Sequence, residues 1–138
     1  MSGSSRMPAK AELAQIPREL IDHFWPYAEP YLRRAQERMG GATSQQLYER
    51  TKARKSDLWG VFVGPDMVAA AITSVRDNTA YVETVGGREM MNWVHLLGEF
   101  EHLAKLHGKT RIEIEGRSGW ARILPGYDCR RVVLGKEL

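Results

Sequence analysis

Three extended apolar segments follow one another in the middle of the chain, and the links between them are very short. The segments are residues 58–63 (LWGVFV), 67–75 (MVAAAITSV) and 79–85 (TAYVETV). The triplets Gly64-Pro65-Asp66 and Arg76-Asp77-Asn78 separate them, and both are typical of turns. Because a parallel crossover needs about a dozen residues or more, links of this length predict antiparallel hairpins. The sequence therefore predicts an antiparallel meander at the centre of the fold.

Helical patterns lie before and after this meander. Thr43 and Gln46 have the spacing of a capping box at the start of one helix. Pro26 and Pro30 predict a kink in an earlier helix, or its division into two short ones, because interior proline removes a backbone hydrogen bond. The expected helices cover residues 17–39, 44–55, 89–107 and 120–124, and two further strands are expected over residues 110–115 and 130–134.

These segments give the order α-α-β-β-β-α-β-α-β. A meander followed by two β-α-β crossings predicts an α/β (α+β) fold, with a mixed, mainly antiparallel sheet and helices on both faces. A chain of 138 residues amounts to one domain, which is expected to span residues 16–138. Residues 1–15 are expected to form a tail or arm, because residues 5–14 have a poor strand pattern.

Composition excludes several classes of protein. Apolar residues make up 43% and charged residues 27%, which excludes a disordered chain and a coiled coil. No apolar run approaches the roughly 20 residues that a membrane-spanning helix needs, so no membrane contact is expected. The first ten residues lack the apolar centre of a signal peptide. The single cysteine, Cys129, cannot form a disulfide within the chain. A reducing, cytoplasmic location is therefore expected.

Residues Asn92, His95, Glu99 and His102 share one face of the expected 89–107 helix, at i, i+3, i+4 spacing. A metal site there would need a further ligand from outside the helix, and the chain has no second Glu-x-x-His motif. The pattern fits the solvated face of an amphipathic helix, so no metal is expected.

Positive charge is concentrated in the first part of the chain. Residues 1–56 hold ten Lys or Arg and six Asp or Glu, whereas residues 57–138 hold ten against eleven. The excess predicts a partner-binding surface for an acidic protein or, less favoured, for nucleic acid. A solvated helix face with interleaved glutamates is the alternative. The candidate partner-binding residues in this part are Arg33, Arg34, Arg38, Arg54 and Lys55.

Several segments carry a resemblance to a known family. They are Leu58–Phe62 (LWGVF), the hairpin into Val85-Gly86-Gly87, the helix with Trp93, and Gly116–Tyr127 (GRSGWARILPGY). Together with the element order, they make residues 16–138 resemble the Gcn5-related N-acetyltransferase (GNAT) superfamily. The nearest likeness is to the small GNAT-like proteins encoded by tailed phages and gene-transfer particles.

The resemblance implies a place for acetyl-CoA, where two parallel strands part and a loop binds the diphosphate. The family pattern of this loop is Gln/Arg-x-x-Gly-x-Gly/Ala, and glycine-rich helix starts bind anions through backbone N–H groups. Here Met91 and Trp93 stand where the pattern has small residues, and they are expected to crowd the diphosphate. Val85, Gly86, Gly87 and Arg88 are the candidate cofactor-binding residues in a shifted register. They alternatively permit only a tight turn.

The resemblance also implies catalytic positions. The family often places a tyrosine acid four residues before a Gly-Phe pair. Gly126-Tyr127 matches that pair, and Arg122 stands at the acid position, where it cannot donate a proton. The family base is commonly a carboxylate on the strand before the loop, which makes Glu83 the weak catalytic candidate.

These departures favour a non-catalytic, degenerate GNAT-like protein that works through its surfaces. The phage likeness suggests a virion or assembly protein that binds phage structural proteins, with Arg117 and Trp120 as further partner anchors. No cofactor is expected for that function. The alternative is a divergent acetyl-CoA-dependent N-acetyltransferase that acts on an amine.

Overall fold

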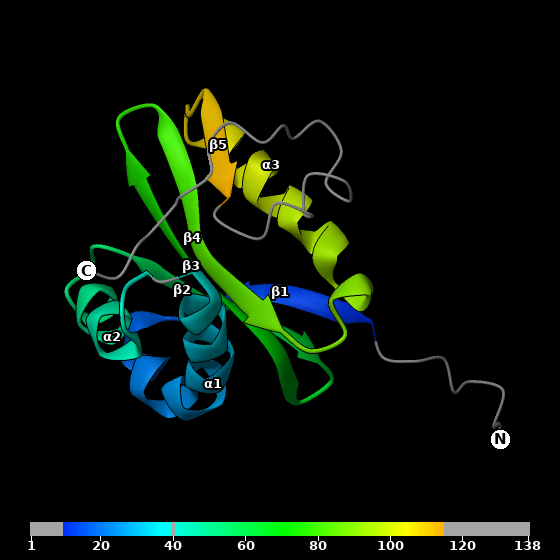
Figure 1. The fold of residues 1–138 in the computed structure, drawn as a ribbon. Helices are drawn as coiled ribbons and strands as arrows, with labels where there is room; N and C mark the ends of the chain where they lie inside the picture. Colours follow the sequence, from blue (N-terminus) through cyan, green and yellow to red (C-terminus); the bar gives the residue numbers. More distant parts are fainter. Residues whose placement is uncertain (1–9, 40, 115–138) are drawn as a thin grey trace, which may run out of the picture.

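The computed structural model describes residues 10–39 and 41–114, which form a five-stranded sheet with helices on both faces (Figure 1). Strands β1 to β4 pair antiparallel with their neighbours, and β4 pairs parallel with β5. This arrangement confirms the predicted meander and the mixed, mainly antiparallel sheet. The strands, in their order across the sheet, are β1 (Ala11–Gln15), β2 (Asp57–Val63), β3 (Asp66–Arg76), β4 (Thr79–Gly87) and β5 (Arg111–Ile114).

Strand β1 corrects the prediction that residues 1–15 form a tail. It pairs with β2 from Ala11 opposite Val63 to Gln15 opposite Trp59. Ala11 and Leu13 contribute to the core, whereas the residues between and after them are exposed. The segment is short and has no β-branched or aromatic side chain, so its local strand signal is weak. Pairing with β2 supplies the stabilisation that local propensity does not.

Two helices cover one face of the sheet: α1 (Ile21–Met39), which follows a 3-10 turn (Arg18–Leu20), and α2 (Ser44–Lys52). The predicted break in the first helix does not occur, because α1 runs continuously through Pro26 and Pro30. Ala28 and Leu32 are fully buried against the sheet, and this burial holds the helix together where proline removes hydrogen bonds.

The start of α2 confirms the predicted capping box. Thr43 Oγ1 accepts from the Gln46 backbone N–H at 3.1 Å, and the Gln46 side chain accepts from the Thr43 N–H at 2.9 Å. Leu47 and Thr51 are buried beneath the helix. The cap therefore fixes where α2 begins, and so which of its side chains face the sheet.

The opposite face is covered by α3 (Gly98–Leu106), which is shorter than the predicted 89–107 helix. Two 3-10 segments, Met90–Asn92 and Val94–Leu97, take its first turns. A period of three keeps Trp93 with Leu96, and Val94 with Leu97, on the same side. All four are buried in the core with Phe100. The predicted strand over residues 110–115 is confirmed as β5, whereas the expected elements 120–124 and 130–134 lie outside the described residues.

Candidate functional site

A β-bulge in β4 places the candidate base. Along the β3–β4 ladder, Ile72 lies opposite Thr84 and Thr73 lies opposite Val82, so Glu83 is the extra residue of the bulge. Val82 faces the α3 side of the sheet, and Thr84 accepts a hydrogen bond from Gln36 of α1 on the other side. The bulge therefore turns Glu83 and Thr84 together towards α1 and α2.

The Glu83 carboxylate is held by two groups on that side. Arg50 of α2 donates to Oε1 and forms an ion pair with it, and Ser56 Oγ donates to Oε2 at 3.4 Å. The Glu83 side chain is 17% exposed, so the carboxylate remains accessible at its edge. Neither Arg50 nor Ser56 was picked out from the sequence, because only the fold brings residues 27 and 33 positions apart from Glu83 beside it.

Glu83 also lies where the described pairing of the two parallel strands ends. The β4–β5 ladder runs from Thr79 opposite Arg111 to Val82 opposite Ile114. Strand β4 then continues to Gly87 against β3. Glu83 is thus the residue of β4 that follows the described β4–β5 pairing, and the sequence resemblance gives the acetyl donor a place between two parallel strands.

The glycines after Val85 are required by close packing. A Cβ at Gly86 would lie 2.6 Å from the Tyr31 carbonyl oxygen of α1, and a Cβ at Gly87 would lie 2.3 Å from the Ala69 Cβ of β3. The Arg88 N–H already donates to the Val68 carbonyl at 2.9 Å. Val85, Gly86 and Gly87 thus belong to β4 and pair with β3, so the predicted tight turn does not occur at the two glycines. The cofactor role of Val85–Arg88 stays a prediction.

Three backbone N–H groups directly afterwards lack an acceptor within the part of the chain that the structure describes. Glu89 has a left-handed backbone, with φ 53°. Its N–H and those of Met90 and Met91 have no hydrogen-bond acceptor among residues 10–39 and 41–114. Successive N–H groups next to a left-handed residue form a concave site that suits an anion. The sequence did not single out these N–H groups, because a left-handed position at a glutamate has no strong local signal.

The two bulky side chains of this loop have different surroundings. Trp93 is 1% exposed in the core, where its Nε1 donates to the Arg88 carbonyl at 2.8 Å. Met91 is 69% exposed. That these side chains crowd a diphosphate stays a prediction.

The candidate partner-binding arginines fall into two groups. Arg33, Arg34 and Arg38 are exposed in the last turns of α1, where Arg33 is paired with Glu29 at 3.2 Å and Glu37 at 3.6 Å. Arg54 and Lys55 follow α2, whose Lys52 contacts Asp22 in the first turn of α1. The two groups thus lie near opposite ends of α1, and they do not form one continuous patch. Arg117 and Trp120 lie outside the described residues.

The described residues offer neither a metal site nor a membrane-spanning helix. In the described part of the chain, no group of three or more His, Cys, Asp or Glu side chains is arranged to hold a metal ion. Asn92, His95, Glu99 and His102 are all exposed, and the 3-10 segments interrupt the single helical face that was expected for them. No helix within residues 10–39 and 41–114 has the length and apolar character needed to cross a bilayer.

Comparison with known proteins gives a consistent answer for the fold. No family model and no curated protein matches the sequence. Among solved structures, a GNAT family acetyltransferase from Staphylococcus aureus aligns over 94% of this chain and 99% of its own, with a TM-score of 0.56 and 12% identity. The chain has the GNAT fold.

Two other structures of this fold show how widely it is shared. A possible acetyltransferase from Clostridium difficile aligns over 94% of this chain and 98% of its own, with a TM-score of 0.60 and 14% identity. An aminoglycoside acetyltransferase from a soil metagenome, solved with sisomicin, covers 93% of this chain and 96% of its own, with a TM-score of 0.63 and 12% identity. At these identities the likeness concerns the GNAT fold alone.

Proposed function

We propose that the protein is an acetyl-CoA-dependent N-acetyltransferase that acts on an amine. The observation that carries this proposal is the open loop after β4, in which the N–H groups of Glu89, Met90 and Met91 lack partners within the described residues. Such groups suit a diphosphate, and they come just after the end of β4, the strand that pairs parallel with β5. The acetyltransferase names of structures with the same fold support this function over a non-catalytic one.

The residues present fit the donor. The loop offers backbone N–H groups, and the Met91 side chain is exposed to solvent. The hydrogen bond from Trp93 Nε1 to the Arg88 carbonyl holds the loop in its conformation. The Glu89 carboxylate adds one negative charge nearby, which Arg88 in the same loop offsets. When bound, acetyl-CoA would supply an acetyl group activated as a thioester.

Glu83 is the group that would receive the proton of the attacking amine. It lies on the bulge of β4, directly after the described β4–β5 pairing, and a carboxylate within reach of the nucleophile, directly or through one water, acts as a general base. Arg50 and Ser56 would act as positioning residues, because they hold the carboxylate in one orientation.

A binding experiment followed by a turnover experiment tests this proposal. Thermal melting with acetyl-CoA should show a shift, because a ligand at 100 times its Kd stabilises a protein by about 2.7 kcal/mol. Release of free thiol should then be measured with a panel of amines that includes aminoglycosides, polyamines and peptides. Absence of any melting shift at millimolar acetyl-CoA would exclude the function.

The non-catalytic function is the second candidate, and two contacts favour it. The Arg50 ion pair occupies one oxygen of Glu83, and the Arg88 N–H is already used within the fold. In that case the basic α1 and α2 surface would bind a protein, for which assembly into a phage-type particle and the Arg117 and Trp120 anchors stay predictions. Folded protein that binds no acetyl-CoA but co-assembles with particle proteins would support it.

A further inference from the structure

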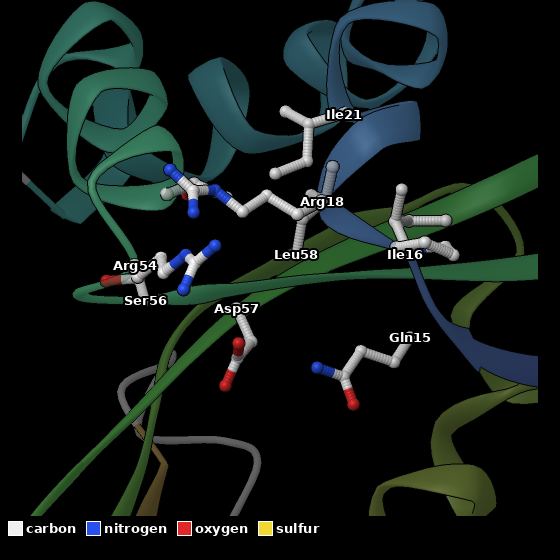
Figure 2. Close-up of a pocket in the computed structure, with 10 residues that line it drawn as sticks. Gln15, Ile16, Arg18, Ile21, Arg54, Ser56, Asp57 and Leu58 are labelled. Atoms are coloured by element: carbon white, nitrogen blue, oxygen red, sulfur yellow. The ribbon is translucent and has the colours of Figure 1, made fainter.

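An open pocket of about 520 Å³ lies away from the loop, at the edge of the sheet where β1 ends and β2 begins (Figure 2). Ile16, Ile21 and Leu58 form an apolar floor, and all three are buried. Two strand spacings, roughly 10 Å, separate β2 from β4, so the pocket is a site of its own. Its volume is in the range of small-molecule sites.

Two guanidinium groups share one wall of this pocket. Figure 2 shows the side chains of Arg18 and Arg54 extending towards the same region above β2. Arg18 Nη2 donates to the Lys52 carbonyl at the end of α2, at 2.5 Å, which fixes the side chain and leaves its other donors available. Arg54 forms no ion pair with any described residue. Neighbouring like charges are unfavourable unless an anion lies between them.

The backbone holds Arg54 in place. It has a left-handed conformation, with φ 63°, directly after the last turn of α2. Its N–H donates to the Thr51 carbonyl at 3.2 Å, and the next N–H, of Lys55, donates to the Arg50 carbonyl at 2.9 Å. A non-glycine residue in this region is uncommon and is held there by its surroundings. Arg54 therefore presents its guanidinium at the pocket with little freedom at its backbone.

The opposite rim limits how much negative charge the pocket can take. Asp57 and Gln15 line it below β2 in Figure 2. Although Asp57 is exposed as a residue, partial burial of its carboxyl raises its pKa. With Asp57 ionised, the three charged side chains sum to a single positive charge. That balance suits a monoanion better than a dianion.

We propose that this pocket binds a small organic monocarboxylate with an aliphatic body. Guanidinium forks match carboxylate oxygens in a bidentate way, so Arg18 and Arg54 take the carboxylate. The aliphatic body lies against the small apolar surface that Ile16, Ile21 and Leu58 leave at the base of the pocket. This site is distinct from the loop after β4, and Ser56 is the described residue that it shares with the surroundings of Glu83.

The test is a titration of the full chain with isocaproate, followed through backbone amide resonances. Isocaproamide is the matched ligand, because it has the same shape without the charge. Isocaproate is expected to saturate at millimolar concentration and to shift the amides of Gln15, Ser56 and Asp57. Isocaproamide should bind at least about tenfold more weakly, because charge-assisted hydrogen bonds are the strong ones.

Variants assign the binding to the two arginines. Arg54→Gln should weaken isocaproate binding by about tenfold or more, which is the same difference as that expected between isocaproate and isocaproamide. Arg34→Gln is the matched control, since Arg34 is exposed on α1 and outside the pocket, and it should bind as the wild type does. Arg18→Gln serves as a second pocket variant, and the amide spectrum shows whether each variant is folded.

Four outcomes overturn the proposal. One is equal binding of isocaproate and isocaproamide. Another is unchanged isocaproate affinity in folded Arg54→Gln and Arg18→Gln. The third is tighter binding of inorganic phosphate than of isocaproate at the same amides. Absence of any shift at saturating isocaproate also overturns it, and none of these results bears on acetyl-CoA binding at the β4 loop.

Discussion

At the scale of single residues, the bulge at Glu83 decides where the chemistry can occur. One inserted residue turns two consecutive side chains of β4 towards α1 and α2, where Arg50 and Ser56 meet the carboxylate. The sequence nominated Glu83 from its place on the strand before the loop. It did not reveal the bulge or the Arg50 contact, because register depends on pairing with β3 and on the docking of α2.

Replacement of Glu83 by glutamine tests its role. If Glu83 accepts the amine proton, Glu83→Gln should lower kcat by about a hundredfold or more and leave the KM for acetyl-CoA nearly unchanged. The free energy of unfolding should fall by no more than about 1 kcal/mol, because Arg50 is partly exposed and the ion pair is screened.

The matched control for this variant is Glu49→Gln. Glu49 is an exposed carboxylate on α2 that accepts only from Gln45 among the described side chains. It should retain full kcat. Equal loss in both variants, or full activity in Glu83→Gln, would show that Glu83 is not the base.

Asp57 predicts a dependence of stability on pH. Because burial raises its pKa in the folded state, the folded chain binds the proton more tightly than the unfolded chain. The contribution of Asp57 to the free energy of unfolding therefore falls as the pH rises from its pKa in the unfolded chain through its pKa in the folded chain. Asp57→Asn should raise the melting temperature at pH 7 relative to wild type, with the difference shrinking towards about pH 3, near and below the ordinary carboxyl pKa. A lower melting temperature at neutral pH would contradict this.

At the scale of elements, prediction succeeded where periodicity was strong and local. The three strands of the meander and the capping box at Thr43 follow from alternation and turn residues, and both are confirmed. It failed where tertiary packing overrides local preference. Burial of Ala28 and Leu32 keeps α1 continuous through its prolines, and pairing with β2 makes a strand of Ala11–Gln15.

The start of α3 illustrates a third kind of failure. An apolar pattern that fits a single helix also fits two 3-10 segments, since both keep Trp93, Leu96 and Leu97 towards the core. The left-handed backbone at Glu89 then begins the loop that the proposed function uses. For the candidate site, the sequence could therefore indicate the strand and the base, but not the N–H groups.

The close approach of β4 to its neighbours gives a stability prediction. Gly87→Ala places a methyl group 2.3 Å from the Ala69 Cβ and 2.6 Å from the Val68 carbonyl oxygen. Neither group can move away without a shift of the β3 backbone. It should lower the free energy of unfolding by about 1–3 kcal/mol, which is typical of overpacking.

Gly98→Ala is the matched control for Gly87→Ala. A Cβ at Gly98, the first residue of α3, would have no atom within 4 Å, and its φ of −63° is already helical. It should raise the free energy of unfolding by up to about 1 kcal/mol. Chemical denaturation measures both variants, and equal stability of the two would show that β4 has room for a side chain.

At the scale of the whole molecule, the two candidate sites use different strands of one sheet. The bulge at Glu83 is in β4 and the candidate loop follows that strand, whereas the pocket of Arg18 and Arg54 lies at the β1–β2 edge (Figures 1 and 2). Ser56 is the one described residue that both lines the pocket and bonds Glu83.

The central claim is that the loop after β4 binds the diphosphate of acetyl-CoA. Titration of the isotope-labelled chain with acetyl-CoA tests it most directly. The account predicts saturable shifts at the amides of Glu89, Met90 and Met91, with the amides of Arg54 and Asp57 unaffected. Unshifted resonances of those three loop amides at saturating acetyl-CoA would contradict it.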